Sequence, residues 1–158
     1  MPLNSDADQR RCRLMAISSG GGHWVQLLRI SLAFDKCDVT FVTVHESYRD
    51  QVADHGFFVI NDATRWNKLG LIKLTLKLAW IIWKKKPEVV ISTGAAPGYV
   101  ALRLGRMMGA RTVWLDSIAN VERLSLSGQK IGQHADLWLT QWAHLAKPEG
   151  PHYAGSVL

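Results

Sequence analysis

The stretch that decides the fold is residues 13–34, RLMAISSGGGHWVQLLRISLAF. Its first part, RLMAISS, is a short apolar run, and three glycines and His23 follow it directly. The residues after His23 carry apolar side chains at helical spacing. An apolar run, a glycine turn and an amphipathic segment in this order are typical of a buried strand that turns straight into a helix. We therefore predict a strand over 13–19 and a helix over 24–34.

The same pattern returns along the rest of the chain. Apolar runs rich in β-branched residues predict further strands, and segments of helical length separate most of them. Strands that are apolar throughout imply a mostly parallel sheet that helices cover on both faces. We expect a doubly wound α/β fold of the Rossmann-like kind, with ligands at the carboxyl ends of the strands. The further strands are expected over 39–44, 57–60, 88–92, 111–115 and 136–140, and helices over 46–55, 68–86 and 99–109.

Length and composition limit the possible classes. A chain of 158 residues is long enough for one domain with a real core, expected over residues 13–158 after a flexible polar segment over 1–12. The formal charge of +6 indicates that one face attracts anions. Cys12 and Cys37 form no metal-binding or disulfide spacing, and the first residues lack the apolar run of a signal peptide. These features favour a reducing cytoplasm.

The glycine turn is the first candidate binding element. Gly20, Gly21 and Gly22 let a ligand approach the backbone, and the helix that follows offers free N–H groups to an anion or a hydroxyl. The turn is neither the GxGxxG fingerprint nor a P-loop. His23 stands where the helix begins, and its imidazole is suited to proton transfer at neutral pH. We interpret His23 as the candidate general base; the alternative is that it only packs against the helix start.

Two later loops add polar groups at the same expected edge. Thr93 and Gly94 follow the strand over 88–92, where the alternative is an ordinary turn. The segment 116–123, DSIANVER, places two carboxylates, an amide, a hydroxyl and a guanidinium directly after the strand over 111–115. Asp116 is placed to assist a base or to bind sugar hydroxyls, and a helix N-cap role for Asp116 or Ser117 is the alternative.

The helix over 68–86, KLGLIKLTLKLAWIIWKKK, is the most unusual segment. Its apolar part is shorter than the roughly 20 residues of a spanning helix, and two lysines interrupt it. Lysines gather on one of its sides, and leucines, isoleucines and tryptophans fill most of the remainder. This pattern is typical of a helix that lies on an anionic membrane surface, although a crossover helix must also cover the sheet. The expected membrane contacts are Lys73, Lys77, Trp80, Trp83 and Lys84.

Three quoted segments together resemble a known family. They are SSGGGHWVQLL, PEVVISTGAAPG and DSIANVERLSLSGQKIGQHADLWLTQW, and the run over 116–142 is the most specific of them. They resemble the PssD-type polysaccharide-biosynthesis proteins. Those in turn are similar to the membrane subunit of the two-chain enzyme that adds the second N-acetylglucosamine to dolichol diphosphate, the Alg-fourteen family. The resemblance covers residues 13–158.

The resemblance implies the N-terminal half of a MurG-like GT-B glycosyltransferase. In such enzymes the N-terminal domain binds the lipid-linked acceptor and the C-terminal domain binds the sugar nucleotide, so a PssE-like donor-binding partner is expected. It implies that the glycine turn borders the acceptor diphosphate and that His23 and Asp116 are the catalytic residues. The eukaryotic relatives carry an N-terminal membrane anchor, and in this chain we expect the helix over 68–86 to provide the membrane contact. Acceptor-binding residues are expected to be Ser19, Gly20, Gly21, Gly22, Thr93, Gly94, Ser117, Asn120, Glu122 and Arg123.

The expected reaction is inverting transfer from a UDP-sugar to a hydroxyl of a polyprenyl-diphosphate-linked saccharide, at the cytoplasmic face of the membrane. GT-B enzymes of this kind use no bound metal, and neither a metal-ligand cluster nor a cofactor is predicted. One alternative is a non-catalytic subunit that recruits a catalytic partner to the membrane. A second is a basic nucleotide- or nucleic-acid-binding module, which the absence of a recognised nucleic-acid motif disfavours. We therefore expect no nucleic-acid partner.

Overall fold

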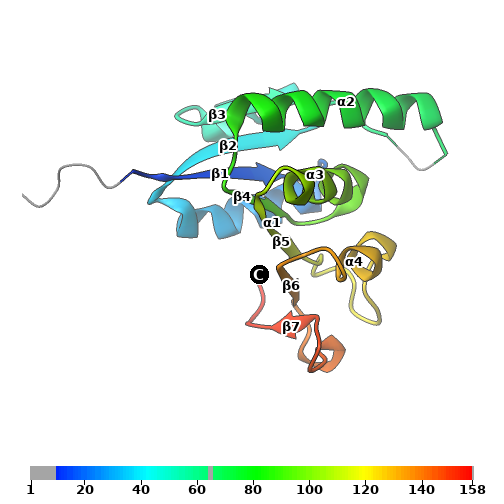
Figure 1. Ribbon diagram of the computed structural model, residues 1–158. Coiled ribbons are helices and arrows are strands. Elements are labelled where there is room, and N and C mark those ends of the chain that lie inside the picture. Colours follow the sequence, from blue (N-terminus) through cyan, green and yellow to red (C-terminus); the bar gives the residue numbers. More distant parts are fainter. Residues whose placement is uncertain (1–9, 64–65, 158) are drawn as a thin grey trace, which may run out of the picture.

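The computed structural model describes residues 10–63 and 66–157. The sheet in this part of the chain has seven strands in the order β3-β2-β1-β4-β5-β6-β7, and all neighbouring strands are parallel. Figure 1 follows the chain from the central β1 outward to β3, and then through α2 to β4 and on to β7. The strands are β1 (Cys12–Ile17), β2 (Cys37–Thr43), β3 (Gly56–Val59), β4 (Val89–Ser92), β5 (Arg111–Leu115), β6 (Leu137–Thr140) and β7 (His152–Tyr153).

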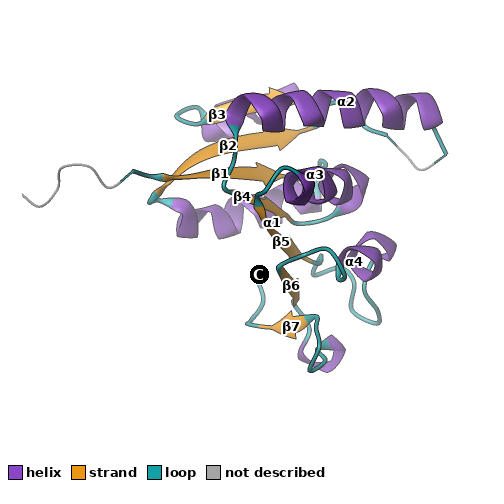
Figure 2. Cartoon of the chain, viewed as in Figure 1, coloured by secondary structure: helices purple, strands orange, loops and turns teal. Residues whose placement is uncertain are grey.

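Helices cover both faces of the sheet, as Figure 2 shows. Side chains of β1 alternate between the two faces, as the period of two in a strand requires. Leu14 and Ala16 pack with Trp24 on one face, whereas Met15 and Ile17 belong to a second core on the other. The first face carries α1 (Gly22–Ile30) and the 3-10 helices η1 (Ser31–Phe34) and η2 (Glu46–Val52), and the second carries α2 (Lys68–Lys85), α3 (Ala95–Met107) and α4 (Leu126–Ile131).

The expected doubly wound, Rossmann-like fold is thus confirmed. Each predicted strand is present, with ends that differ by at most two residues, and the ends of β5 match the prediction. The sequence did not predict α4, the short helix η3 (Ala143–Leu145) or β7, which has only two residues. Residues 1–9 of the expected flexible segment 1–12 lie outside the described residues, and Cys12 already pairs with Cys37 in the sheet.

Two predicted helices differ from the structure. The segment 46–55 was expected to be helical, and it forms the 3-10 helix η2 because two of its side chains reach the same tryptophan. Tyr48 stacks on Trp24 with ring centroids 4.8 Å apart, and Gln51 accepts a hydrogen bond of 2.8 Å from the Trp24 indole. Residues three apart are aligned in a 3-10 helix, which places both on one side. The expected helix over 24–34 is divided into α1 and η1.

The helices of the second face have clear start and stop signals. Asn67 caps α2 by accepting a 2.9 Å hydrogen bond from Gly70 N–H, and Ser125 caps α4 through Gly128 N–H at 2.8 Å. The helix α2 ends at Lys86, which takes a left-handed conformation with φ 47, before Pro87. The helix α3 begins at Ala95, earlier than predicted, because Pro97 fits the first turn of a helix, where no N–H partner is needed.

Candidate functional site

The carboxyl ends of the central strands lie side by side. Ile17 at the end of β1 pairs with Ser92 at the end of β4, and Leu115 at the end of β5 pairs with Leu139 in β6. The loops that follow these strands therefore begin next to one another. This is the edge at which parallel α/β sheets bind ligands.

The glycine turn after β1 is shaped by two side chains from the neighbouring loop. A Cβ atom added to Gly20 would lie 2.5 Å from the ring of His45, so only glycine fits beneath that imidazole. Gly21 has φ 63, a conformation that favours glycine, and its N–H donates a 3.0 Å hydrogen bond to the hydroxyl of Tyr48. His45 and Tyr48 thus border the turn. Neither residue was predicted from the sequence, although His45 directly follows the predicted strand 39–44.

His23 and Thr93 join the first two loops by a reciprocal pair of hydrogen bonds. The Nδ1 atom of His23 lies 2.9 Å from the carbonyl oxygen of Thr93, and the Thr93 hydroxyl donates a 2.7 Å bond to the carbonyl oxygen of His23. Because a carbonyl only accepts, Nδ1 carries the proton, and Nε2 of the neutral ring has the free lone pair. Within the described part of the chain, no hydrogen-bond partner reaches Nε2. The ring is therefore held in one orientation, with Nδ1 toward Thr93.

Gly94 lies against the ring of His23. A Cβ atom at Gly94 would approach His23 Cε1 to 2.5 Å, and the backbone there has φ 137. The next residue, Ala95, has φ 68, which is uncommon for a residue with a side chain and costs of order 1 kcal/mol. The backbone is therefore strained beside the imidazole of His23. The lack of a side chain at Gly94 leaves the space that the ring occupies.

Asp116 has a different environment from His23. Its side chain is 1% exposed and accepts four hydrogen bonds. The donors are the indole N–H of Trp114, the amide of Asn120, and both the backbone N–H and the hydroxyl of Ser125. Both carboxylate oxygens are occupied by groups of its own chain, at distances of 2.6–3.1 Å. In this arrangement Asp116 anchors the loop between β5 and α4, and it is not the helix N-cap, which is Ser125.

A buried pair of glutamines ties this loop to the helix that carries His23. Gln26, one turn after His23 in α1, donates to the Ser117 hydroxyl at 3.1 Å and accepts from Ile118 N–H. Gln141 donates to Gln26 at 2.6 Å and to the carbonyl oxygen of Asp116 at 3.0 Å. Both glutamines are at most 5% exposed. Neither glutamine was predicted from the sequence. For Gln26 the available signal was a polar residue inside the apolar segment WVQLL.

The structure brings together some of the expected acceptor-binding residues and separates others. Thr93 and Gly94 lie against His23, and Gly20, Gly21 and Gly22 form the turn that leads into it. The Ser19 carbonyl, at the start of that turn, accepts a hydrogen bond from the Thr43 hydroxyl at the end of β2. The side chains of Ser117 and Asn120 face inward, toward Gln26 and Asp116.

The last two expected contacts, Glu122 and Arg123, are exposed. They line a different hollow, beside Trp138, His144 and Lys147. They therefore contribute to the surface near β6 and not to the wall next to His23.

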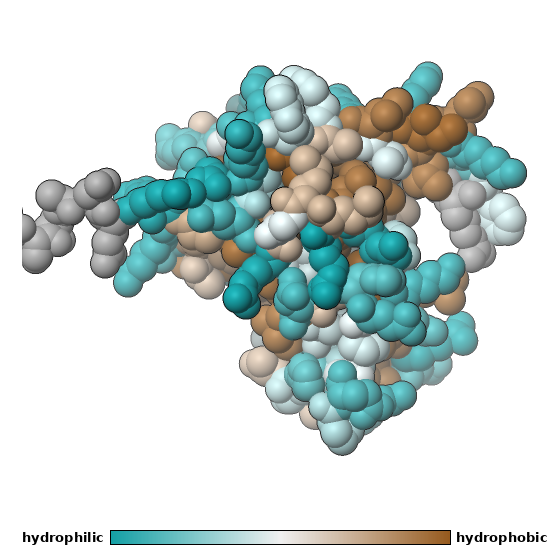
Figure 3. All heavy atoms as spheres, viewed as in Figure 1, coloured by the Kyte–Doolittle hydropathy of each residue, from teal (hydrophilic) through white to brown (hydrophobic). Residues whose placement is uncertain are grey.

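The outward side of α2 is apolar, and Figure 3 shows brown surface over the N-terminal part of that helix. Its residues follow one another at steps of three or four, and each is 48–73% exposed. The opposite side of α2 packs on the sheet through Leu74 and Leu78. No helix in the described residues has the length and apolar character needed to cross a membrane. The outward apolar residues are Leu69, Ile72, Leu76, Trp80 and Trp83, and we call them the α2 stripe.

The lysines of α2 lie beside this stripe. Lys73, Lys77 and Lys84 are exposed, and Lys84 Nζ lies 4.9 Å from the centre of the Trp80 ring. Their exposure beside apolar side chains is the arrangement that the sequence predicted.

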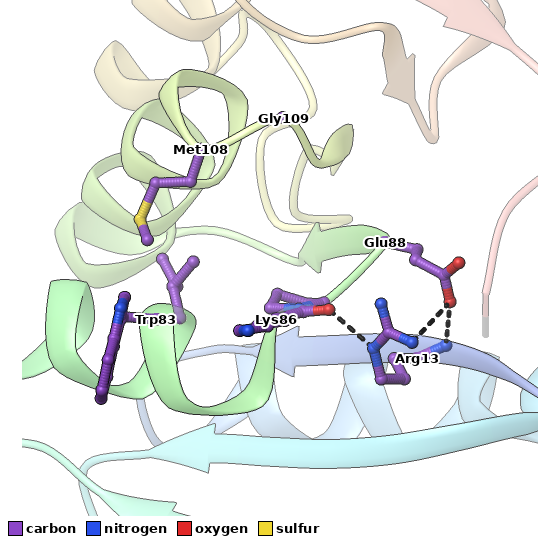
Figure 4. A pocket seen from close by; sticks show the side chains of 8 residues that line it. Arg13, Trp83, Lys86, Glu88, Met108 and Gly109 are labelled. Carbon is purple, nitrogen blue, oxygen red and sulfur yellow. Dashed lines mark hydrogen bonds and ion pairs between the residues drawn. The ribbon is translucent and has the colours of Figure 1, made fainter.

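A second large hollow lies at the opposite, amino edge of the sheet. It measures about 390 Å³, and Figure 4 shows Arg13, Glu88 and Trp83 around it. The Arg13 guanidinium donates to the carbonyl oxygen of Lys86 at 2.7 Å and lies 3.7 Å from the Glu88 carboxylate. These contacts hold the start of β4 next to the start of β1. None of the expected site residues except Trp83 lines this hollow.

The described residues contain no group of three or more histidine, cysteine or acidic side chains placed to hold a metal ion.

Comparisons with known proteins agree with this description. A sequence model of the family "Oligosaccharide biosynthesis protein Alg14 like" matches residues 60–157, which include the most specific run of the resemblance, 116–142. The UDP-N-acetylglucosamine transferase subunit ALG14 of Yarrowia lipolytica is 28% identical over 165 residues, covering 85% of this chain and 76% of that protein.

Solved structures share the fold. MurG of Acinetobacter baumannii superposes with a TM-score of 0.73 at 13% identity, over 92% of this chain and 45% of MurG. The UDP-N-acetylglucosamine 2-epimerase of Rickettsia bellii gives a TM-score of 0.65 at 13% identity, over 85% of this chain and 40% of that enzyme. The chain thus spans less than half the length of these enzymes, and it resembles the N-terminal half of MurG. Because a transferase and an epimerase share this fold, the fold alone does not define the reaction.

Proposed function

This chain belongs to the family of Alg14-like oligosaccharide biosynthesis proteins, and we propose that it is the acceptor-binding, membrane-associating subunit of a two-chain glycosyltransferase. The observation that carries the proposal is the hydrogen bond from His23 Nδ1 to the Thr93 carbonyl oxygen, which directs a basic Nε2 away from the protein's own groups. A base held in one tautomer at the ligand-binding edge of the sheet is what deprotonation of an acceptor hydroxyl requires.

The proposed reaction transfers a sugar from a UDP-sugar to a polyprenyl-diphosphate-linked saccharide, with inversion. The acceptor hydroxyl attacks the anomeric carbon, the bond between that carbon and the UDP oxygen breaks, and UDP leaves with the electron pair. His23 Nε2 takes the hydroxyl proton. Asp116 supports the reaction by holding the loop after β5 through its four hydrogen bonds, and Gln26 fixes that loop to α1.

The donor-binding half is assigned to a second protein. A GT-B enzyme has two such domains facing a cleft, and this chain superposes on 45% of MurG. We propose a PssE-like partner that binds the UDP-sugar and faces the glycine turn. The relative from Yarrowia lipolytica is itself described as a transferase subunit, which supports this division.

We further propose that the α2 stripe lies on the cytoplasmic face of a membrane. Five exposed apolar side chains with flanking lysines form an interfacial surface, in which tryptophans sit at the headgroup level and lysines contact anionic lipids. Peripheral attachment through α2 brings the enzyme to an acceptor that is anchored in that membrane.

The decisive experiment is glycosyl transfer on liposomes that contain a polyprenyl-diphosphate-sugar. The chain is assayed alone, the donor-binding partner alone, and then both together, with a panel of UDP-sugars that includes UDP-N-acetylglucosamine. We expect transfer only when both proteins are present. Transfer by the partner alone at the full rate would overturn the assignment of the acceptor site to this chain.

A second candidate is a recruitment subunit without a catalytic residue, which the exposed α2 stripe favours equally. The two candidates differ at His23, because a recruiting subunit keeps the liposome-bound partner active when His23 is replaced. Full turnover by a His23→Ala complex that still binds liposomes would establish recruitment.

A further inference from the structure

A third hollow lies between the three helices of the second face and is lined mainly by carbon atoms. Its volume is about 320 Å³, at the lower end of the roughly 300–1,000 Å³ typical of small-molecule sites. Its polar groups are the hydroxyls of Tyr99 and Ser127 and the ammonium group of Lys130. The lining residues are Leu71 from α2, Ala96, Tyr99 and Val100 from α3, and Leu126, Ser127 and Lys130 from α4, and we call this hollow the α2–α4 groove.

The groove opens at the same edge of the sheet as the candidate site. Leu71, Ala96 and Leu126 all lie in or next to the first turns of their helices. Crossover helices run antiparallel to the strands, so these first turns stand at the carboxyl edge. Ala96 is two residues after Gly94, which lies against the His23 ring. The wall of the groove therefore begins two residues after the backbone that lies against His23.

The groove and the α2 stripe lie on different faces of the same helix. Leu69 and Ile72, on either side of Leu71 in α2, are 73% and 55% exposed. Successive residues of an α-helix are about 100° apart, so Leu71 faces the groove whereas Leu69 and Ile72 face outward. The single ammonium group, on Lys130, is placed at a mostly apolar wall, which suits an amphiphile with an anionic head.

We propose that the α2–α4 groove binds the isoprene units nearest the diphosphate of the lipid-linked acceptor, with Lys130 close to a phosphate oxygen. This rests on the proposed function, because it takes the acceptor to be a prenyl diphosphate. The groove then guides the lipid from the membrane and presents the sugar to His23. It also makes the isoprenoid part of the acceptor a determinant of specificity.

Direct binding is tested with geranylgeranyl diphosphate that carries a diazirine on its first isoprene unit, in mild detergent, with the full chain and with the two-chain complex. We expect photolabelled peptides from α3 and α4, and loss of labelling in Ser127→Trp, which fills the groove from a half-buried position. Leu32→Trp is the matched control, because Leu32 is 86% exposed on the other face of the sheet. Labelling confined to the α2 stripe would overturn the proposal.

Transfer kinetics separate this inference from the proposed function. Two acceptors with the same diphosphate-sugar are compared, one on a prenyl chain and one on a short alkyl group. Ser127→Trp should raise KM for the prenyl acceptor about tenfold, the effect of losing a few buried methylene groups, and leave kcat and the short acceptor unchanged. Leu126→Glu, at a 60% exposed position that folding tolerates, should act in the same direction.

The kinetic results distinguish failure of the proposed function from failure of the groove assignment. If the wild-type complex transfers to neither acceptor, the proposed function fails. If it transfers to both and the groove variants affect them equally, only the groove assignment fails. A helix of the partner protein in the groove would protect a Ser127→Cys thiol from maleimide in the lipid-free complex, and that result would also overturn the proposal.

Discussion

The imidazole of His23 and the carbonyl of Thr93 hold each other in place across two loops that are 70 residues apart in the chain. The 2.9 Å bond from Nδ1 fixes the tautomer, and the 2.7 Å bond from the Thr93 hydroxyl fixes the backbone that carries the ring. A histidine at a helix start is common. In this one the hydrogen bond from Nδ1 to Thr93 leaves Nε2 available, which is the arrangement that proton transfer needs.

Replacing His23, the proposed base, should slow the chemical step without weakening the fold. We expect His23→Ala to lower kcat of the two-chain complex by about 10²–10⁴, the usual contribution of general base catalysis. His152→Ala is the control, since His152 is exposed in β7 at the far edge of the sheet. Steady-state kinetics on the same liposomes give the comparison, and equal rates for both variants would rule out His23 as the base.

A substitution at Gly94 tests whether the position of the His23 imidazole matters. Gly94→Ala adds a Cβ atom 2.5 Å from His23 Cε1, so the imidazole must move and kcat should fall at least about tenfold, since about 1 Å of misplacement has large effects. Gly109→Ala is a matched control: its φ is 90, and a Cβ atom there meets nothing within 4 Å. Both substitutions strain the backbone, but only the first touches the base. Similar kcat values for the two would show that the contact with His23 is unimportant.

Asp116 should matter for stability more than for proton transfer. Asp116→Asn removes a buried carboxylate that accepts four hydrogen bonds, and the new amide N–H group faces donors. We expect the free energy of unfolding to fall by roughly 2–4 kcal/mol, measured by urea denaturation. Asp35→Asn, at an exposed position, should change it by less than about 0.5 kcal/mol.

The pH dependence of kcat distinguishes the two residues further. If Asp116 were the base, the conservative variant would abolish the acidic limb of the profile, whereas an anchoring role leaves the shape of the profile unchanged in the molecules that remain folded.

The lysines beside the α2 stripe should set the affinity for anionic lipid. Lys73→Gln with Lys77→Gln removes two charges worth about 1 kcal/mol each near a lipid surface, so liposome partitioning should weaken roughly thirtyfold. Lys36→Gln with Lys147→Gln makes the same change in net charge at exposed positions outside α2. Co-sedimentation with liposomes that contain phosphatidylserine measures both, and equal losses would indicate a nonspecific effect of charge.

Because of Asp136, the stability of the fold should depend on pH in the acidic range. Burial acts to raise its pKa, but hydrogen bonds from Thr112 and the charge of Arg106 outweigh burial and lower the pKa below its ordinary value. A depressed carboxyl pKa stabilises the fold above the unfolded pKa of about 4, and this stabilisation is lost as pH falls further. We expect Asp136→Asn to lower Tm at pH 7 and to match the wild type more closely near pH 3. A constant difference in Tm across this range would contradict the assignment.

The sequence determined the class of fold and the position of the glycine turn. Apolar runs such as 39–44 and 111–115 are buried on both sides, so their composition alone indicates a parallel sheet. Three glycines before a helix likewise need no tertiary information, because backbone freedom and the free N–H groups are local properties. His23 could be selected for the same reason, and α2 showed its two apolar sides through the spacing of its residues.

The tertiary structure alone decided what each polar side chain does. Asp116 and His23 are both candidate catalytic residues in the sequence, and their partners in the fold distinguish them. Four donors saturate the carboxylate, whereas one carbonyl orients the imidazole. Gln26 and Gln141 are 115 residues apart, and their 2.6 Å contact depends on how the strands pair. Hydrogen bonds are short and directional, so they are fixed by long-range packing, whereas the hydrophobic pattern that defines the fold can be read one segment at a time.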